Sequence, residues 1–90
     1  MLESKIKVCN PLGLHARAAA QLVRLASGFK SKIKLRRTDN HIFADAKSIL
    51  SALTLAASKG VELKIEVEGK DESEAMQAIE EIFRKGFGET

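Results

Sequence analysis

The chain has 90 residues, of which 44% are hydrophobic and 30% charged, and its net charge is +3. A chain of this length forms one domain, residues 1–90, with little room for a deep catalytic cleft beside its core. No apolar stretch approaches the roughly 20 residues of a membrane span, and the N-terminus has no signal-peptide core. The single cysteine, Cys9, cannot form an internal disulfide and is interpreted as a small buried apolar group. We therefore expect a cytoplasmic protein that is not embedded in a membrane.

Positive charge is concentrated in residues 1–40, which hold nine Lys or Arg and only two acidic residues. Residues 41–90 hold six basic and ten acidic residues. An excess of positive charge suits an acidic partner protein or a phosphate group. Solvated strand faces and helix ends would explain the same charges equally well.

The first half of the chain predicts a strand, a helix and a hairpin. Residues Lys5–Cys9 alternate between polar and apolar side chains, as in a half-buried strand. A turn at Asn10–Gly13 leads into a helix over Ala16–Ala26. Alternation resumes in Lys32–Arg36, and His41–Asp45 is predicted as the second strand of a hairpin.

The second half predicts a helix, a strand and a final helix. Ser48–Ala57 forms the short helix, and Val61–Glu68 has the cleanest alternation of the chain. Asp71 and Glu74 stand in the positions of a capping pair. The helix that they open has a core stripe formed by Ala75, Met76, Ile79, Ile82 and Phe83. A sheet of four strands with one solvent-exposed face requires helices packed against its other face, which indicates an α+β fold.

The segment Asn10–Ala20 places a histidine at the start of a helix. His15 falls at or next to the N-cap, where the backbone N–H groups of Ala16 and Arg17 and the helix dipole can hold an anion. A neutral imidazole offers a nucleophilic nitrogen, and the guanidinium of Arg17 has a planar fork that suits phosphate oxygens. Phosphoryl transfer requires little more than such positioning and charge. Taken alone, however, the pattern favours another interpretation over a phosphoryl acceptor, in which His15 only caps the helix.

The motif Gly13-Leu14-His15-Ala16-Arg17 resembles the active-site motif of HPr, the phosphocarrier family of the phosphoenolpyruvate-dependent sugar phosphotransferase system. The resemblance extends over nearly the whole chain in length and element order. It implies an open-faced sandwich, in which three helices cover one face of a four-stranded antiparallel sheet. It also implies a stoichiometric carrier, not an enzyme, that is phosphorylated on Nδ1 of His15, uses Arg17 to hold the phosphate and needs no cofactor. Family members usually have proline where this chain has Ala18, which leaves the stiffness of the His15 loop open.

A second motif, Lys47-Ser48-Ile49-Leu50, opens the second helix. Ser48 is a good N-cap, and by resemblance it matches the regulatory serine that HPr kinase/phosphorylase modifies. A phosphate there would be stabilised by the helix end and would repel an acidic partner. The resemblance also implies Enzyme I as phosphoryl donor and IIA proteins or domains as acceptors. A carrier that exchanges partners is expected to work as a monomer. The expected partner surface consists of Leu14, Ala20, Arg24, Lys47, Ile49, Leu50 and Leu53. The helical spacing of Leu50 and Leu53 fits a position in the core equally well.

The branch of the family is left open by the sequence. The turn Asn10–Gly13, the hairpin turn Arg37–Asn40 and the ending Lys85–Gly88 look similar to the nitrogen-related paralogue, NPr. Ser48 favours a serine-regulated HPr, and we favour HPr slightly. An RNA-binding αβ module is disfavoured, and no nucleic-acid partner is expected, because the chain has no Tyr or Trp and only Phe43 lies in a strand. No cluster has metal-ligand spacing.

Overall fold

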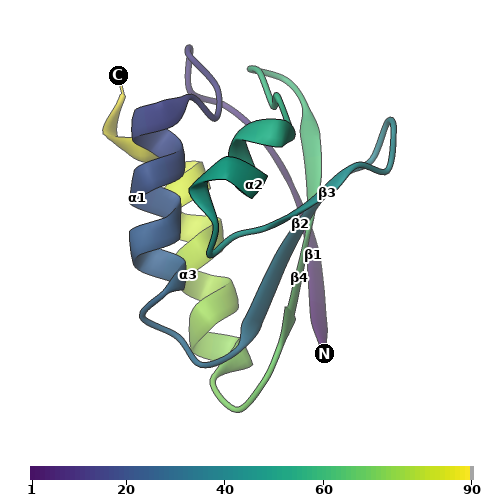
Figure 1. Ribbon diagram of the computed structural model, residues 1–90, viewed down its shortest axis with the longest axis vertical. Helices are drawn as coiled ribbons and strands as arrows, with labels where there is room; N and C mark the ends of the chain where they lie inside the picture. The colour runs from purple at the N-terminus through teal and green to yellow at the C-terminus, as the bar shows by residue number, and fades with distance from the viewer. Residues whose placement is uncertain (90) are drawn as a thin grey trace.

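The protein was analysed as a computed structural model, which describes residues 1–89 (Figure 1). Elements alternate along the chain in the predicted order of strand, helix, strand, strand, helix, strand and helix. The strands are β1 (Leu2–Lys7), β2 (Lys32–Arg37), β3 (Phe43–Asp45) and β4 (Glu62–Glu68). The helices are α1 (Ala16–Ala26), α2 (Ile49–Thr54) and α3 (Glu72–Arg84), and a short 3-10 helix follows at Gly86–Gly88.

The strands form one antiparallel sheet in the order β1-β4-β2-β3. The last strand in the sequence, β4, therefore lies in the centre between β1 and β2. Some outward-facing pairs have opposite charges, since Lys32 lies opposite Glu68 and Lys34 opposite Glu66, whereas Arg36 lies opposite Lys64. Opposite charges in such cross-strand pairs contribute roughly 0.2–1 kcal/mol each. The predicted antiparallel sheet is confirmed.

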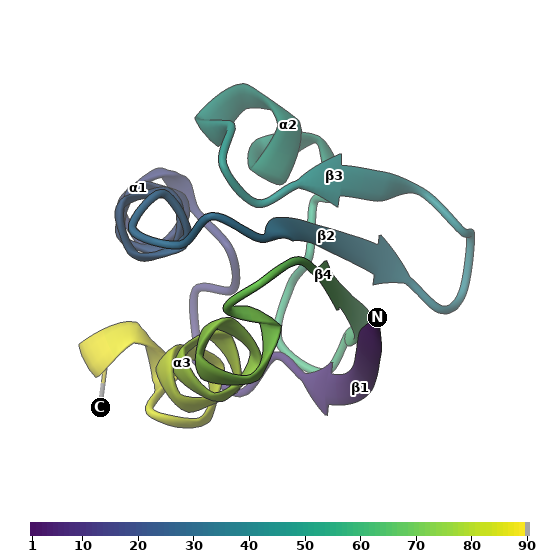
Figure 2. The ribbon, with the colours of Figure 1, turned by 90° about the horizontal axis from the view of Figure 1, so that it is seen from below.

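All three helices lie on one face of the sheet and leave the other face uncovered (Figure 2). Helix α3 packs against β1 and β4, α2 packs against β3, and α1 contacts both of the other helices. The strict alternation of β4 turns Leu63, Ile65 and Val67 into the core and its charged residues outward. The open-faced sandwich expected from the sequence is confirmed.

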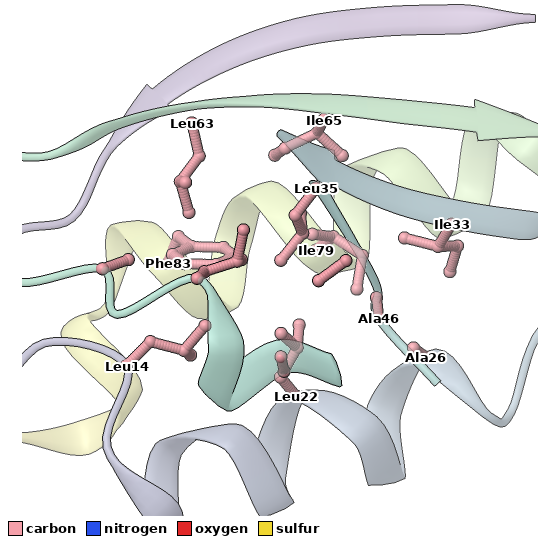
Figure 3. Packing of buried hydrophobic residues seen from close by; sticks show 14 of the residues in the cluster. Leu14, Leu22, Ala26, Ile33, Leu35, Ala46, Leu63, Ile65, Ile79 and Phe83 are labelled. Carbon is pink, nitrogen blue, oxygen red and sulfur yellow. The ribbon is translucent and has the colours of Figure 1, made fainter. Parts of the chain in front are cut away.

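The core lies between the sheet and the helices (Figure 3). Leu22 of α1 and Ile79 and Phe83 of α3 are completely buried there. Burying an apolar side chain of this size contributes about 1.5–3 kcal/mol relative to leaving it in water. The predicted stripe of α3 is thus confirmed, with Ile82 at its edge and only partly buried.

Several element boundaries differ from the sequence prediction. Strand β1 runs from Leu2 to Lys7 instead of Lys5–Cys9, and the chain turns away after Val8. The prediction that Cys9 is buried is wrong, because this residue lies beyond the strand and is exposed. Helix α2 ends at Thr54, before the predicted Ala57, since Ala56 takes a left-handed backbone conformation with φ 49°. A residue with positive φ cannot continue a right-handed helix.

The predicted capping pair of Asp71 and Glu74 is also wrong. Asp71 occupies the N-cap position of α3, but its side chain makes no capping hydrogen bond. Its carboxylate instead accepts hydrogen bonds from Lys30 N at 2.8 Å, Ser31 N at 2.9 Å and Ser31 Oγ at 2.5 Å. Donors brought in by the tertiary fold therefore displace the local capping interaction, and Asp71 fastens the start of β2 to the start of α3.

Candidate phosphoryl-acceptor site

His15 is the N-cap residue of α1, as the sequence predicted. Its backbone is extended, with φ −79° and ψ −179°, and its carbonyl accepts the hydrogen bond of Ala19 N at 2.8 Å. The ring nitrogen Nδ1 accepts a hydrogen bond from Arg17 N at 3.3 Å. A nitrogen that accepts carries a free lone pair. The side chain is 25% exposed, so the unprotonated Nδ1 belongs to a partly exposed ring at the end of the helix.

The loop before His15 is fixed by a close approach to the chain that follows α2. Leu14 N donates a hydrogen bond to Ala57 O at 2.8 Å. Gly13 has φ +66°, and a Cβ at this position would lie 2.5 Å from Ala57 O and 2.8 Å from Ser58 Cα. Glycine is required here both for its conformation and for the space that it leaves free. The position of His15 therefore depends on a contact between two loops.

Asn10 closes the same loop from within. Its backbone O accepts from Gly13 N at 3.1 Å, and its side-chain Nδ2 donates to Gly13 O at 2.6 Å. The residue is buried, with 1% of its surface exposed. Asparagine side chains that bond to the backbone of their own turn hold that turn in place. Residues Asn10 to Gly13 are thus a rigid support for the histidine.

Glu89, which the sequence analysis did not single out, contacts the other ring nitrogen of His15. Its Oε2 is hydrogen-bonded to Nε2, so the tautomer that satisfies both ring nitrogens carries its proton on Nε2. The hydrogen bond with His15 is the main cause that lowers the pKa of the Glu89 carboxyl below its ordinary value. The two residues are separated by 74 positions, and no pattern in the sequence links them.

Arg17 lies in the first turn of α1 and is exposed. Within residues 1–89, its guanidinium has no hydrogen-bonded partner, so it is available to a ligand at the helix end. Arg24 is exposed in the last turn, and Ala20 between them is half-buried. Because seven residues make about two helical turns, Arg17 and Arg24 lie on the same side of α1. Arg24 therefore shares a side of α1 with Arg17, but it lies about two turns further from His15.

The whole chain resembles proteins of one family. Residues 2–85 match the family model described as the PTS HPr component phosphorylation site. The chain belongs to the HPr family. It is 44% identical over 89 residues to phosphocarrier protein HPr of Xylella fastidiosa, covering 99% of this chain and 98% of that one. It is also 35% identical over 88 residues to phosphocarrier protein NPr of Escherichia coli, covering 98% and 97% of the two chains.

The fold gives the same assignment. The crystal structure of HPr-C-His from Thermoanaerobacter tengcongensis matches with a TM-score of 0.92 and 39% sequence identity, covering 100% of this chain and 99% of that one. As a member of the HPr family, the chain is a phosphocarrier of the phosphotransferase system and not a catalyst. Among the described residues, no helix is long and apolar enough to cross a membrane.

The apolar residues expected on the partner surface of this HPr-family protein are divided between surface and core. Ile49 and Leu50 of α2 are 43% and 78% exposed, whereas Leu53 is partly buried against the core. Leu14 is only 5% exposed and points into the core, so it offers no docking surface (Figure 3). Leu12, which was not expected, is 65% exposed and lies three residues before His15. Ile49 and Leu50 of α2 and Leu12 in the loop before α1 are thus the exposed apolar residues considered for this surface, whereas Ile42 and Phe43 are exposed in the hairpin.

Ser48 is the N-cap residue of α2, as predicted. Its Oγ accepts a hydrogen bond from Ser51 N at 3.2 Å, and the hydroxyl of Ser51 in turn accepts from Asp45 N at 2.9 Å. The neighbouring Lys47 does not extend into solvent, because its Nζ donates to Phe29 O at 2.7 Å. Lys47 therefore ties the start of α2 to the loop after α1, while the Ser48 side chain stays half-buried at the helix end.

Proposed function

We propose that His15 accepts the phosphoryl group at Nδ1 from phospho-Enzyme I and passes it to a IIA protein or domain. The observation that carries this proposal is the orientation of the imidazole: Nδ1 accepts from the Arg17 backbone at the N-terminus of α1. An unprotonated nitrogen beside the backbone N–H groups of the first helical turn is suited both to attack phosphorus and to place the phosphate oxygens, with the Arg17 N–H passing from Nδ1 to a phosphate oxygen.

The transfer requires one bond to form and one to break. The lone pair of Nδ1 attacks phosphorus, and the bond from phosphorus to the donor atom of Enzyme I breaks with its electron pair remaining on that atom. The transferred oxygens then lie beside the N–H groups of Ala16 and Arg17, where the helix dipole is positive. The guanidinium of Arg17 supplies a planar pair of donors. Transfer to a IIA partner repeats the same exchange with the phosphocarrier as donor.

The choice of partners rests on the family and on the surface around His15. Arg17 and Arg24 suit partners with an acidic rim, and the exposed Ile49 and Leu50 suit a shallow apolar surface. The higher identity to HPr of Xylella fastidiosa, 44% against 35% for NPr of Escherichia coli, supports the sugar branch. A carrier of the nitrogen-related system is the alternative. In either system the proposed carrier works as a monomer in the cytoplasm.

Regulation through Ser48 is a second part of the proposal. The hydroxyl already lies at the N-terminus of α2, so a phosphate attached to it remains next to backbone donors. It would add about 1.5 to 2 negative charges near pH 7. These charges would lower the affinity for an acidic donor protein without unfolding the helix. HPr kinase/phosphorylase is the proposed modifying enzyme.

Incubation with phosphoenolpyruvate and Enzyme I tests the role of His15. The wild-type protein is expected to acquire a single acid-labile, base-stable phosphate. His15→Ala should abolish it, and Arg17→Ala should reduce its rate of formation. The matched control is His41→Ala, since His41 is the other histidine of the chain and is exposed. Undiminished labelling of the His15→Ala protein would refute the proposal.

Incubation with HPr kinase and ATP tests the role of Ser48. An acid-stable phosphate is expected in the wild-type protein and in Ser27→Ala, a control at the exposed C-cap of α1. Ser48→Ala should remain unlabelled. Equal labelling of the Ser48→Ala protein would show that another residue is the target.

A further inference from the structure

We infer that Glu89 is a positioning residue for phosphoryl transfer, which orients the His15 ring and keeps its proton on Nε2. The inference rests on the proposed role of His15 as the acceptor. It assigns a function to the C-terminal segment, which neither the histidine motif nor the serine motif includes.

Both carboxylate oxygens of Glu89 are engaged at the site. Oε2 contacts Nε2 of His15, and Oε1 accepts from Asn10 Nδ2 at 3.2 Å and from Leu12 N at 3.3 Å. The Glu89 side chain is only 13% exposed, so most of its surface is covered by the protein. One carboxylate therefore connects the histidine ring to the loop that carries it.

The chain before Glu89 is anchored by packing. Phe87 is buried and meets Phe83 edge to face, with ring centroids 5.0 Å apart. Phe87 also has φ +55°, a conformation that a bulky residue adopts only when its surroundings impose it. In Figure 1 the segment leads from the end of α3 to the first turn of α1. The strained backbone at Phe87 is thus part of the path that delivers Glu89 to His15.

The chemical consequence follows from the tautomer. A neutral imidazole has one protonated and one free nitrogen, and only the free nitrogen can attack phosphorus. An acceptor held at Nε2 favours the tautomer whose Nδ1 is free. As Nδ1 bonds to phosphorus, the ring gains positive charge, and an adjacent carboxylate offsets that charge. Because the His15 hydrogen bond lowers the pKa of Glu89, its carboxylate is ionised at neutral pH.

A Glu89→Gln variant tests this role, because it keeps the size of the side chain and removes its charge. Glu74→Gln is the matched control, since Glu74 is exposed on α3. Phosphorylation by phosphoenolpyruvate and Enzyme I is measured together with the ¹⁵N chemical shifts of the His15 ring near pH 8. The rate should fall roughly 3- to 10-fold in Glu89→Gln, as for a lost charge-assisted hydrogen bond at a partly exposed site. The fraction of the ring protonated on Nε2 should fall, because the amide of Gln is a weaker acceptor than the carboxylate and can also present its NH2 group to the ring.

Two results would overturn the inference. One is a phosphorylation rate in Glu89→Gln equal to that of Glu74→Gln, and the other is a slower rate with an unchanged tautomer. Failure of the proposed function has a different signature, because labelling would then persist in His15→Ala. The tautomer measurement requires no phosphoryl transfer, so it reports on the Glu89 contact in either case.

Discussion

Replacing Gly13 by alanine tests whether the loop contact before His15 controls the position of the acceptor. Gly13 combines a positive φ of +66° with a backbone neighbour, Ala57 O, at 2.5 Å from the position of a new Cβ. Gly60 has a similar positive φ of +94°, but nothing lies within 4 Å of its Cβ position. The pair Gly13→Ala and Gly60→Ala therefore separates backbone strain from steric collision.

The expected magnitudes follow from these two causes. A non-glycine residue in the left-handed region costs about 1–2 kcal/mol, and both variants bear this cost. Only Gly13→Ala adds a collision with backbone atoms that cannot rotate away, and overpacking of this kind costs about 1–3 kcal/mol. We therefore expect Gly13→Ala to lower the free energy of unfolding by about 2–5 kcal/mol and Gly60→Ala by about 1–2 kcal/mol.

Urea denaturation measures the loss of stability, and phosphorylation by Enzyme I measures the displacement of His15. Relief of the collision must separate residue 13 from Ala57, which strains the hydrogen bond from Leu14 N to Ala57 O. A shift of the acceptor by about 1 Å can slow a reaction roughly 100-fold, so Gly13→Ala should be phosphorylated at least about 10 times more slowly than Gly60→Ala. Equal stability and equal rates in the two variants would refute the reasoning.

Burial and hydrogen bonding predict three other outcomes, all measurable by urea denaturation. Leu22→Ala in the core should lower the free energy of unfolding by about 2–5 kcal/mol, and Leu50→Ala, at a side chain 78% exposed, by less than about 0.5 kcal/mol; similar losses would contradict the packing described. Ser48→Ala removes the N-cap of α2 and should cost about 1 kcal/mol, whereas no loss would show that the cap is dispensable. Hydrogen bonds from the Ser31 side chain and nearby backbone N–H groups lower the pKa of Asp71 from 3.8 to about 2. Since this pKa is lower in the folded than in the unfolded protein, Asp71 stabilises the fold above pH 3.8 and loses that effect as the pH falls toward 2. The stability difference between wild type and Asp71→Asn should therefore shrink over this pH range, and a constant difference would exclude the carboxylate as its source.

Local patterns predicted most of the fold and the centre of the site. The alternation of β4 identified its buried face, and the helix-forming run Ala16–Ala26 gave α1 its observed bounds. Both N-caps, His15 and Ser48, were also predictable, because a cap depends on a residue and the turn that follows it. The resemblance of the Gly13 to Arg17 segment then indicated the family. These features are determined within a few residues of chain.

Contacts between distant segments decided the rest. Asp71 fits a capping pattern, yet its carboxylate bonds to Lys30 and Ser31, because the folded chain brings two backbone N–H groups and a hydroxyl to it. Leu14 lies beside His15 in sequence but packs into the core. The sequence by itself therefore determined where α1 begins and that a histidine occupies its N-cap. Only the tertiary structure decided what contacts the other ring nitrogen, Nε2, because that contact depends on Glu89, 74 residues away, which the packing of Phe87 brings to the ring.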